Sequence, residues 1–161
     1  MADEAAPVLD VRGLTTVFHT RQGEIHAVNA VSFALKRGEV LGVVGESGSG
    51  KSVTMMSLVG LLPTPPAEVR AGQVMLGTRD LLQMSAKDLS DVRGAKVGFV
   101  FQDPMTSLNP VFTVENQICE PLTRHMGLSK AEARARSIEL LELVGIPDAA
   151  KRVKYYPHQF S

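Results

Sequence analysis

The sequence predicts an α/β protein, and three observations lead to this fold class. Two stretches near the start, residues 8–19 and 25–35, have the composition of strands. A glycine-rich stretch at residues 45–52 lies between a short apolar run and a longer one that Pro63 ends. Beyond residue 112, helix-capping patterns precede segments with helical periodicity. We therefore expect a strand pair, a strand–loop–helix unit and a helical segment, in that order.

The first two strands are predicted by their side-chain pattern and by the turn between them. In the second stretch apolar side chains recur at alternate positions, at Val31, Phe33 and Leu35. Residues 20–23 are polar and end in glycine, as the loops of hairpins often do. Because the glycine-rich unit does not need such a pair, we expect an antiparallel β layer attached to a central α/β core.

The central unit carries the most specific motif in the chain. Residues 39–44 are mostly apolar and rich in valine, which predicts a strand buried on both faces. Residues 53–62 are predominantly apolar and predict a buried helix. Between them the sequence fits the phosphate-binding pattern G-x-x-x-x-G-K-S, formed by Gly45, Glu46, Ser47, Gly48, Ser49, Gly50, Lys51 and Ser52.

This motif predicts a site for the phosphates of a nucleotide together with Mg²⁺. The glycines allow successive backbone N–H groups to point into one concavity, and the following helix adds its positive dipole end. Lys51 supplies a full positive charge for the outer phosphates, and the Ser52 hydroxyl offers an oxygen ligand of the kind Mg²⁺ prefers. The alternative is a Gly/Ser-rich surface turn that fits the pattern by accident. The flanking strand and helix patterns favour the phosphate site.

A second candidate site follows residues 97–101, an apolar run that predicts another strand ending at Gln102 and Asp103. Functional groups collect at the carboxyl ends of strands in parallel α/β sheets. We therefore expect Gln102 and Asp103 on the same edge as the phosphate loop, within reach of a metal ion or an attacking water. For Asp103, capping of the loop before Pro104 is an equally good interpretation.

Phe18 stands at the end of the first predicted strand, beside two polar residues. Its ring either stacks on an adenine base or faces the core of the protein. The residue pattern alone favours the core.

The last part of the chain is predicted to be helical. Thr113 is a candidate N-cap, and Ser129 with Glu132 fits a capping box. Gly145 follows the second helical pattern and predicts its end. We expect a nucleotide-binding core over residues 1–104 and a helical subdomain over residues 105–161.

Charge and cysteine content narrow the function classes. Seventeen lysines and arginines balance 17 aspartates and glutamates, which argues against a general binder of nucleic acid or membrane surfaces. The single cysteine, Cys119, has no partner for an internal disulfide, as in proteins of reducing compartments. The sequence shows neither a secretion signal nor a run of about 20 apolar residues. These features lead us to expect a cytosolic protein that is able to dock on a membrane protein.

Taken together, these residues resemble the ATP-binding subunits of ABC transporters, in particular those of oligopeptide and dipeptide importers, with nickel importers nearby. Three stretches carry the resemblance: residues 45–52, residues 101–110 with the sequence FQDPMTSLNP, and residues 156–161 with the sequence YPHQFS. The similarity extends from about Leu9 to Ser161. It implies a P-loop NTPase core with an N-terminal antiparallel β subdomain and a helical subdomain.

The resemblance also implies roles and partners. Phe18 would match the aromatic residue that stacks on adenine, which reverses the interpretation from the pattern alone. Gln102 would touch Mg²⁺ and the attacking water, and Ser161 would belong to a signature motif that contacts ATP. The implied function is the ATP-binding subunit of an importer that brings peptides across the cytoplasmic membrane. It would lie peripherally on the cytoplasmic face with permease subunits, a second ATP-binding subunit and, indirectly, a substrate-binding protein, without nucleic acid.

The family pattern continues beyond Ser161 with two further signature glycines, an apolar strand ending in Asp-Glu, and a switch histidine. We therefore expect an incomplete sheet, and no ATP turnover by this chain alone, because the catalytic carboxylate is missing from it. Two other classes stay open. One is a stand-alone, kinase-like phosphate-loop enzyme in which Asp103 holds Mg²⁺, and the other is a non-catalytic nucleotide-binding fragment.

Overall fold

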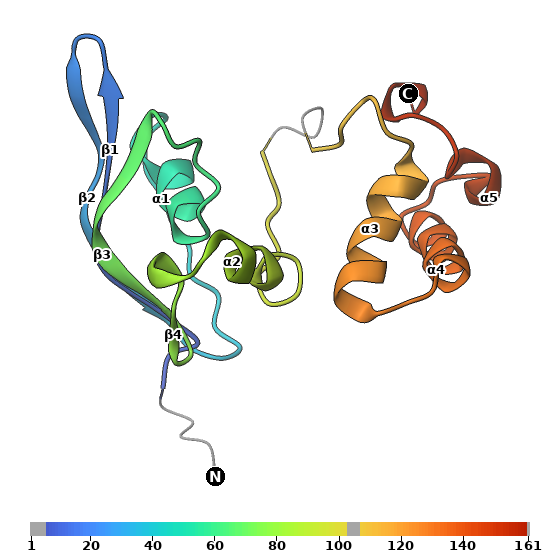
Figure 1. Cartoon of the computed structure of the whole chain (residues 1–161), viewed down its shortest axis with the longest axis horizontal. Coiled ribbons are helices and arrows are strands. Elements are labelled where there is room, and N and C mark those ends of the chain that lie inside the picture. The colour runs from blue at the N-terminus through green and yellow to red at the C-terminus, as the bar shows by residue number, and fades with distance from the viewer. Residues whose placement is uncertain (1–5, 103–106, 161) are drawn as a thin grey trace. The chain divides into compact units, whose positions relative to one another are not determined.

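The computed structural model of the chain describes residues 6–102 and 107–160. The chain forms two compact units, residues 1–90 and 91–161 (Figure 1). The first unit holds the β-sheet and helix α1, and the second holds helices α3, α4 and α5. The division into a nucleotide-binding core and a helical subdomain at residue 104 stays a prediction.

The sheet of the first unit is antiparallel and has the strand order β2-β1-β3-β4. Strand β1 (Leu9–Thr20) pairs with both β2 (Gly23–Leu35) and β3 (Ala67–Leu76). The short strand β4 (Arg79–Asp80) pairs with the end of β3. The strand pair and the antiparallel β layer predicted from the sequence are thereby confirmed.

Strand β1 lies inside the sheet and supplies much of its buried apolar surface, from Val11, Leu14 and Val17. Its register with β2 shifts next to Gly13, where the ladder is irregular. There, side-chain oxygens accept the hydrogen bonds of backbone donors. The Gly13 N–H donates to Ser32 Oγ at 2.8 Å, and the Ala30 N–H donates to Thr15 Oγ1 at 3.1 Å. Backbone donors that leave the ladder are therefore still paired.

Helix α1 (Lys51–Leu58) begins directly after the glycine-rich loop and lies against the sheet (Figure 1). Two buried hydroxyls, Thr16 Oγ1 of β1 and Ser57 Oγ of α1, lie 2.9 Å apart and fix the helix to the strand. The sequence predicted a helix as far as residue 62, and this is wrong by four residues. Gly60 adopts a left-handed φ of 60°, and the Leu61 N–H donates to the Met56 carbonyl, which closes the helix early.

Two predicted strands do not form within the described part of the chain. Residues 39–44 join no sheet, and Val40 and Val44 are 95% and 93% exposed. Of residues 97–101, only Val97 makes a bridge, to Arg93, and Val100 is 96% exposed. The physical reason is that a strand needs a neighbouring strand along its length to accept and donate its backbone hydrogen bonds, and the described residues supply no such strand to either segment.

After the sheet the chain forms the short helix η1 (Leu81–Gln83) and then α2 (Ala86–Val92). The Asp88 N–H donates to Ser85 Oγ at 3.1 Å, so Ser85 caps the start of α2.

The second unit contains α3 (Val114–Met126), α4 (Lys130–Leu143), α5 (Ala149–Arg152) and the single-turn helix η3 (Pro157–Gln159). Its core is formed by four buried residues, Val114, Leu141, Ala149 and Val153. The chain after α5 returns to the start of α3, where the N–H groups of Val114 and Glu115 donate to the carbonyls of Tyr155 and Val153. These bonds satisfy donors that a helix start otherwise leaves open.

The helix-capping predictions for this unit are confirmed. Thr113 accepts a hydrogen bond from the Asn116 N–H, and Ser129 and Glu132 form a reciprocal capping box. Gly145 has a left-handed φ of 79° just beyond the end of α4. Over the part of the chain that the structure describes, none of the helices has the length and apolar character needed to cross a membrane.

Candidate functional site

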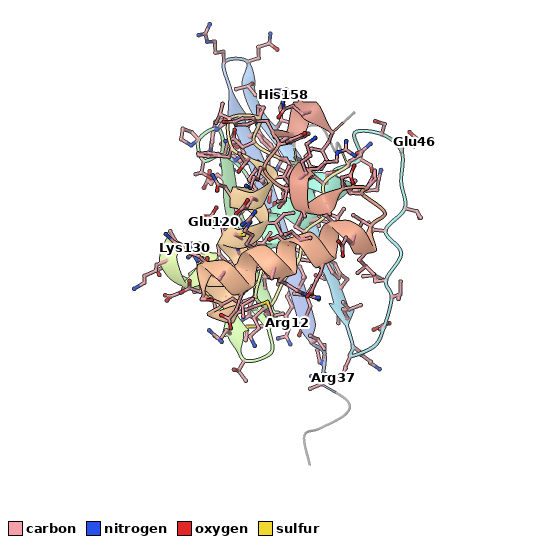
Figure 2. The ribbon with its side chains drawn as sticks, turned by 90° about the vertical axis from the view of Figure 1, so that its right-hand side faces the viewer. Arg12, Arg37, Glu46, Glu120, Lys130 and His158 are labelled. Atoms are coloured by element: carbon pink, nitrogen blue, oxygen red, sulfur yellow. The ribbon has the colours of Figure 1, made fainter. Side chains whose placement is uncertain are left out.

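The phosphate-loop motif forms an exposed loop that leads into α1. Residues 45–49 are exposed, and only Gly50, where the helix begins, is partly covered. Figure 2 shows Glu46 on an outlying loop of the first unit. The loop is therefore accessible to a ligand from solution.

Glycine is required where this loop meets the sheet. Gly50 has a φ of 90°, and a Cβ atom built on it would lie 2.4 Å from the Ala27 carbonyl oxygen of β2. The β1–β2 register shifts between the pairs that flank Ala27, Thr16 with Val28 and Val17 with His26. The loop end is thus seated against a bulge of β2, at a distance that only glycine allows.

Lys51 reaches back across the loop. Its Nζ donates to the carbonyl oxygens of Gly45 and Glu46, each at 2.7 Å, and to Ser49 Oγ at 3.3 Å. These contacts hold a full positive charge over the loop. An anion bound at the loop would lie close to this ammonium group and be attracted by its charge.

The start of α1 adds further donors. The first backbone bond of the helix runs from the Thr54 N–H to the Gly50 carbonyl at 2.8 Å, and Thr54 Oγ1 donates to the same oxygen at 2.9 Å. The N–H groups before Thr54 precede the helical ladder, and the first turn contains no acidic residue. Ser52, in this turn, is exposed. A cation, free N–H groups and a hydroxyl therefore meet at one helix start, which fits phosphate and Mg²⁺.

The structure does not bring all predicted site residues to this loop. Gln102 is exposed and belongs to the second unit, so its approach to the loop stays a prediction. Phe18 is half-buried on β1, opposite Ile25 of β2 and Ala67 of β3. Its stacking on a base also stays a prediction. Asp103 and Ser161 lie outside the described residues.

Sequence reasoning missed the residues that support the loop. Thr16 and Ser57 anchor α1 to the sheet through their hydroxyls, and Gly50, at the end of the loop, packs closely against the Ala27 carbonyl. Thr16 and Ser57 are 41 residues apart, and no local pattern links them. One signal could have found Thr16: it is a polar residue in a predicted strand, between the apolar residues Leu14 and Val17.

Comparison with known proteins agrees with this geometry. The sequence profile of the family described as "ABC transporter" matches residues 28–161. The chain is 48% identical to the oligopeptide transport ATP-binding protein OppD of Bacillus subtilis, over 96% of this chain and 43% of that protein. It is 46% identical to the dipeptide transport ATP-binding protein DppD of Lactococcus lactis, over 100% of this chain and 46% of that protein.

Among solved structures, the chain resembles the ATP-binding cassette MJ0796 in its dimeric, post-hydrolysis state bound to ADP and Pi. The TM-score is 0.78 at 26% identity, over 95% of this chain and 63% of that one. The chain spans less than half the length of the curated relatives named above. The profile match covers most of the chain, and the fold agrees with that of a solved cassette. This chain belongs to the ABC transporter family.

Proposed function

We propose that this chain binds Mg·ATP through residues 45–52 and acts as an ATP-binding component of an ABC transporter. The observation that carries the proposal is the placement of the Lys51 ammonium group over the loop carbonyls at the start of α1. A triphosphate is the ligand class that uses a cation, a helix N-terminus and a neighbouring hydroxyl together. The names of the relatives, which are ATP-binding proteins, support the same ligand.

Different residues of the loop would bind different parts of Mg·ATP. Backbone N–H groups of the loop and Lys51 would hold the phosphates, and Ser52 would offer its hydroxyl to Mg²⁺. Bound Mg²⁺ supplies neutralisation of charge that develops on the transferred phosphoryl group. Gln102 would contact Mg²⁺ and the attacking water, and Phe18 would face the adenine base.

The experiment is a calorimetric titration with Mg·ATP of the native chain and of Lys51→Ala. Loss of a charge-assisted contact of about 1.5–3 kcal/mol lowers affinity roughly ten- to a hundredfold. Lys130→Ala is the matched control, because Lys130 also begins a helix but lies outside the loop. Equal affinity of the native chain and a folded Lys51→Ala variant would contradict the proposal.

We further propose that the transported substrate is a peptide. The support is that the relatives at 46–48% identity are named as oligopeptide and dipeptide transport proteins. The test is ATP-dependent uptake by vesicles that contain the assembled transporter with its permease subunits and substrate-binding protein. Peptide uptake supports the proposal, whereas uptake of nickel alone would move the chain to the nickel importers.

We propose that the permease contacts the segment from residue 105 to about residue 126, which includes the loop before α3. Val111 and Phe112 are 69% and 51% exposed there, and contiguous exposed apolar groups are typical of docking surfaces. Such docking would hold the protein peripherally on the cytoplasmic face of the membrane. Cross-links from a cysteine at position 108 to permease loops test this contact. Cross-links that form only from the phosphate-loop side would refute it.

We also propose that ATP turnover requires two ATP-binding subunits, since the solved cassette MJ0796 is dimeric. The 161-residue chain alone is then expected to release no phosphate above a Lys51→Ala control. Turnover of about 1 s⁻¹ or more by the monomer would favour an independent, kinase-like enzyme instead. In that case Asp103→Asn would impair Mg·ATP binding more than Gln102→Ala.

A further inference from the structure

Four charged or ionisable side chains form a connected group near the tip of the β1–β2 hairpin. We name His19, Glu24, Glu68 and Arg70 the hairpin cluster. Arg70 donates to both carboxylate oxygens of Glu24, at 2.9 and 2.7 Å, and to Glu68 at 3.2 Å. His19 Nε2 lies 2.7 Å from Glu68, and its Nδ1 lies 3.5 Å from Glu24. The cluster therefore links three strands through their side chains.

The strand register places this cluster immediately beside Phe18. Phe18 pairs with Ile25 of β2 and with Ala67 of β3. Glu24 and Glu68 are each next to one of these partners, and His19 directly follows Phe18. Arg70 lies three residues beyond Ala67, and its side chain reaches both carboxylates. The His19 N–H also donates to the Pro66 carbonyl at 2.9 Å. Ion pairs at the next position, between His19 and the two glutamates, therefore connect β1 to both β2 and β3 beside Phe18.

The cluster and Phe18 lie on opposite faces of the sheet, because successive side chains of a strand alternate. Thr16, two residues before Phe18, contacts Ser57 of α1. Phe18 therefore shares the face of α1, whose first residue is Lys51. The cluster therefore braces this part of the sheet from the face opposite the Phe18 ring.

The charges in the cluster support one another. The hydrogen bond from Arg70 is the main reason why the pKa of Glu24 falls from 4.5 to about 2. The pKa of Glu68 is also lowered, first by the hydrogen bond to His19 and then by the one to Arg70. Exposed ion pairs contribute little to stability one at a time, but a bidentate Arg–carboxylate pair fixes geometry. The cluster is better suited to holding strands in place than to raising overall stability.

We propose that the hairpin cluster positions Phe18 for stacking on the nucleotide base, with Arg70 as the central positioning residue. This inference rests on the proposed function, in which Phe18 contacts the adenine. A ring held in its binding position before the ligand arrives loses less conformational freedom on binding. Without the cluster, the end of the hairpin frays, and part of the stacking free energy is spent on ordering it.

The test measures dissociation constants for Mg·ATP and for magnesium triphosphate in four variants: Phe18→Ala, Arg70→Ala, the double variant, and Arg12→Ala. Arg12 is the matched control, because it also forms an exposed ion pair on β1, with Asp10, away from Phe18. Phe18→Ala weakens ATP binding roughly five- to tenfold, as expected for one stacking contact of about 1 kcal/mol. Arg70→Ala weakens it roughly two- to fivefold, and Arg12→Ala leaves it unchanged. None of these changes affects triphosphate binding.

The double variant separates positioning from general support. If Arg70 acts through Phe18, adding Arg70→Ala to Phe18→Ala produces no further loss of ATP affinity. Independent, multiplying losses would overturn the inference, and so would equal weakening of both ligands by Arg70→Ala. Should Arg70→Ala unfold the chain, Arg70→Lys keeps the charge but loses the bidentate pair, and the same outcomes apply.

Failure of the proposed function has a different signature. If Phe18→Ala leaves the ratio of ATP to triphosphate affinity unchanged, Phe18 does not contact the base, and the inference is overturned with it. If the native chain binds neither ligand, the phosphate loop itself is not a site. If Phe18→Ala changes the ratio and Arg70→Ala does not, only the role of the cluster is refuted.

Discussion

The helical unit and the segment before the phosphate loop carry comparably clear sequence patterns, yet only the helical unit forms as predicted. Ser129 and Glu132 predict a capping box, and the box is present. Residues 39–44 predict a buried strand, and they are exposed without a strand partner in the described part of the chain. A cap is satisfied within one helical turn, whereas a strand depends on backbone groups far away in the sequence. The difference shows which sequence signals are local and which are conditional on neighbours.

Strand β1 makes the same point from the other side. It has a strand on each side, and Leu14 is fully buried. Residues 39–44 have similar apolar content but no such neighbours among the described residues.

The largest expected effect is the difference between Leu14→Ala and Val40→Ala in the 161-residue chain. Leu14 is fully buried and Val40 is 95% exposed. Truncation of a buried leucine costs about 2–5 kcal/mol in free energy of unfolding. Truncation of an exposed side chain usually changes it by less than about 0.5 kcal/mol. Urea unfolding at equal protein concentration measures both, and a comparable loss for Val40→Ala would mean that residues 39–44 are buried in solution.

The variants Gly50→Ala and Gly48→Ala compare a loop glycine that packs against β2 with one that does not. Both residues have a left-handed φ, of 90° and 81°, but only at Gly50 would the new Cβ approach a backbone atom, the Ala27 oxygen. We expect Gly50→Ala to cost about 2–3 kcal/mol and Gly48→Ala about 1 kcal/mol, because both pay backbone strain and only one also displaces the loop end. Thermal unfolding checks the order. Equal costs would show that the loop does not rest on β2.

The sequence predicted the parts of the fold that are encoded over a few residues. The hairpin of β1 and β2, the caps at Thr113 and Ser129, and the start of α1 after Gly50 all follow from turn residues, alternation or capping side chains. The end of α1 was misplaced because Gly60, rather than Pro63, stops the helix. The apolar runs at 39–44 and 97–101 have the composition of buried strands. Whether they form strands depends on neighbouring strands that these residues cannot supply themselves.

The candidate site shows the same division. The loop residues and Lys51 were found from spacing, since phosphate binding uses consecutive backbone groups. The hairpin cluster was missed, although His19 and Glu24 flank the turn at positions that face each other across the hairpin. A search for opposite charges at paired positions around a predicted turn would have found them.

Ser129→Ala sharpens the contrast at the helical unit. It removes the cap that the Ser129 side chain gives to the Glu132 N–H, so we expect a loss of about 1 kcal/mol. Circular dichroism during urea unfolding measures this loss. Lys130→Ala, at the exposed next position of the same helix, is the control. No loss for Ser129→Ala would mean that packing alone specifies α4.

The smallest expected effect concerns pH. Because the pKa of Glu24 is lowered in the folded state, its contribution to stability is complete above about 4.5 and disappears as the pH falls toward about 2. The lowered pKa of Glu68 acts in the same direction. We expect the urea midpoint of the native chain to fall more steeply over this range than that of Arg70→Ala, in which the main partner is absent. Parallel pH profiles would contradict the ion pairing in the hairpin cluster.

Hydrogen exchange of the chain with and without Mg·ATP tests the central claim most directly. The claim is that nucleotide binds at residues 45–52, on a loop that the adjoining sheet and α1 hold in place. Without nucleotide, we expect amides of β1 to be protected and those of residues 40–49 to exchange rapidly. Mg·ATP should then slow exchange in residues 45–54 and leave α3 and α4 unchanged. Unchanged exchange at residues 45–54 under saturating Mg·ATP, or protection confined to α3 and α4, would contradict the claim.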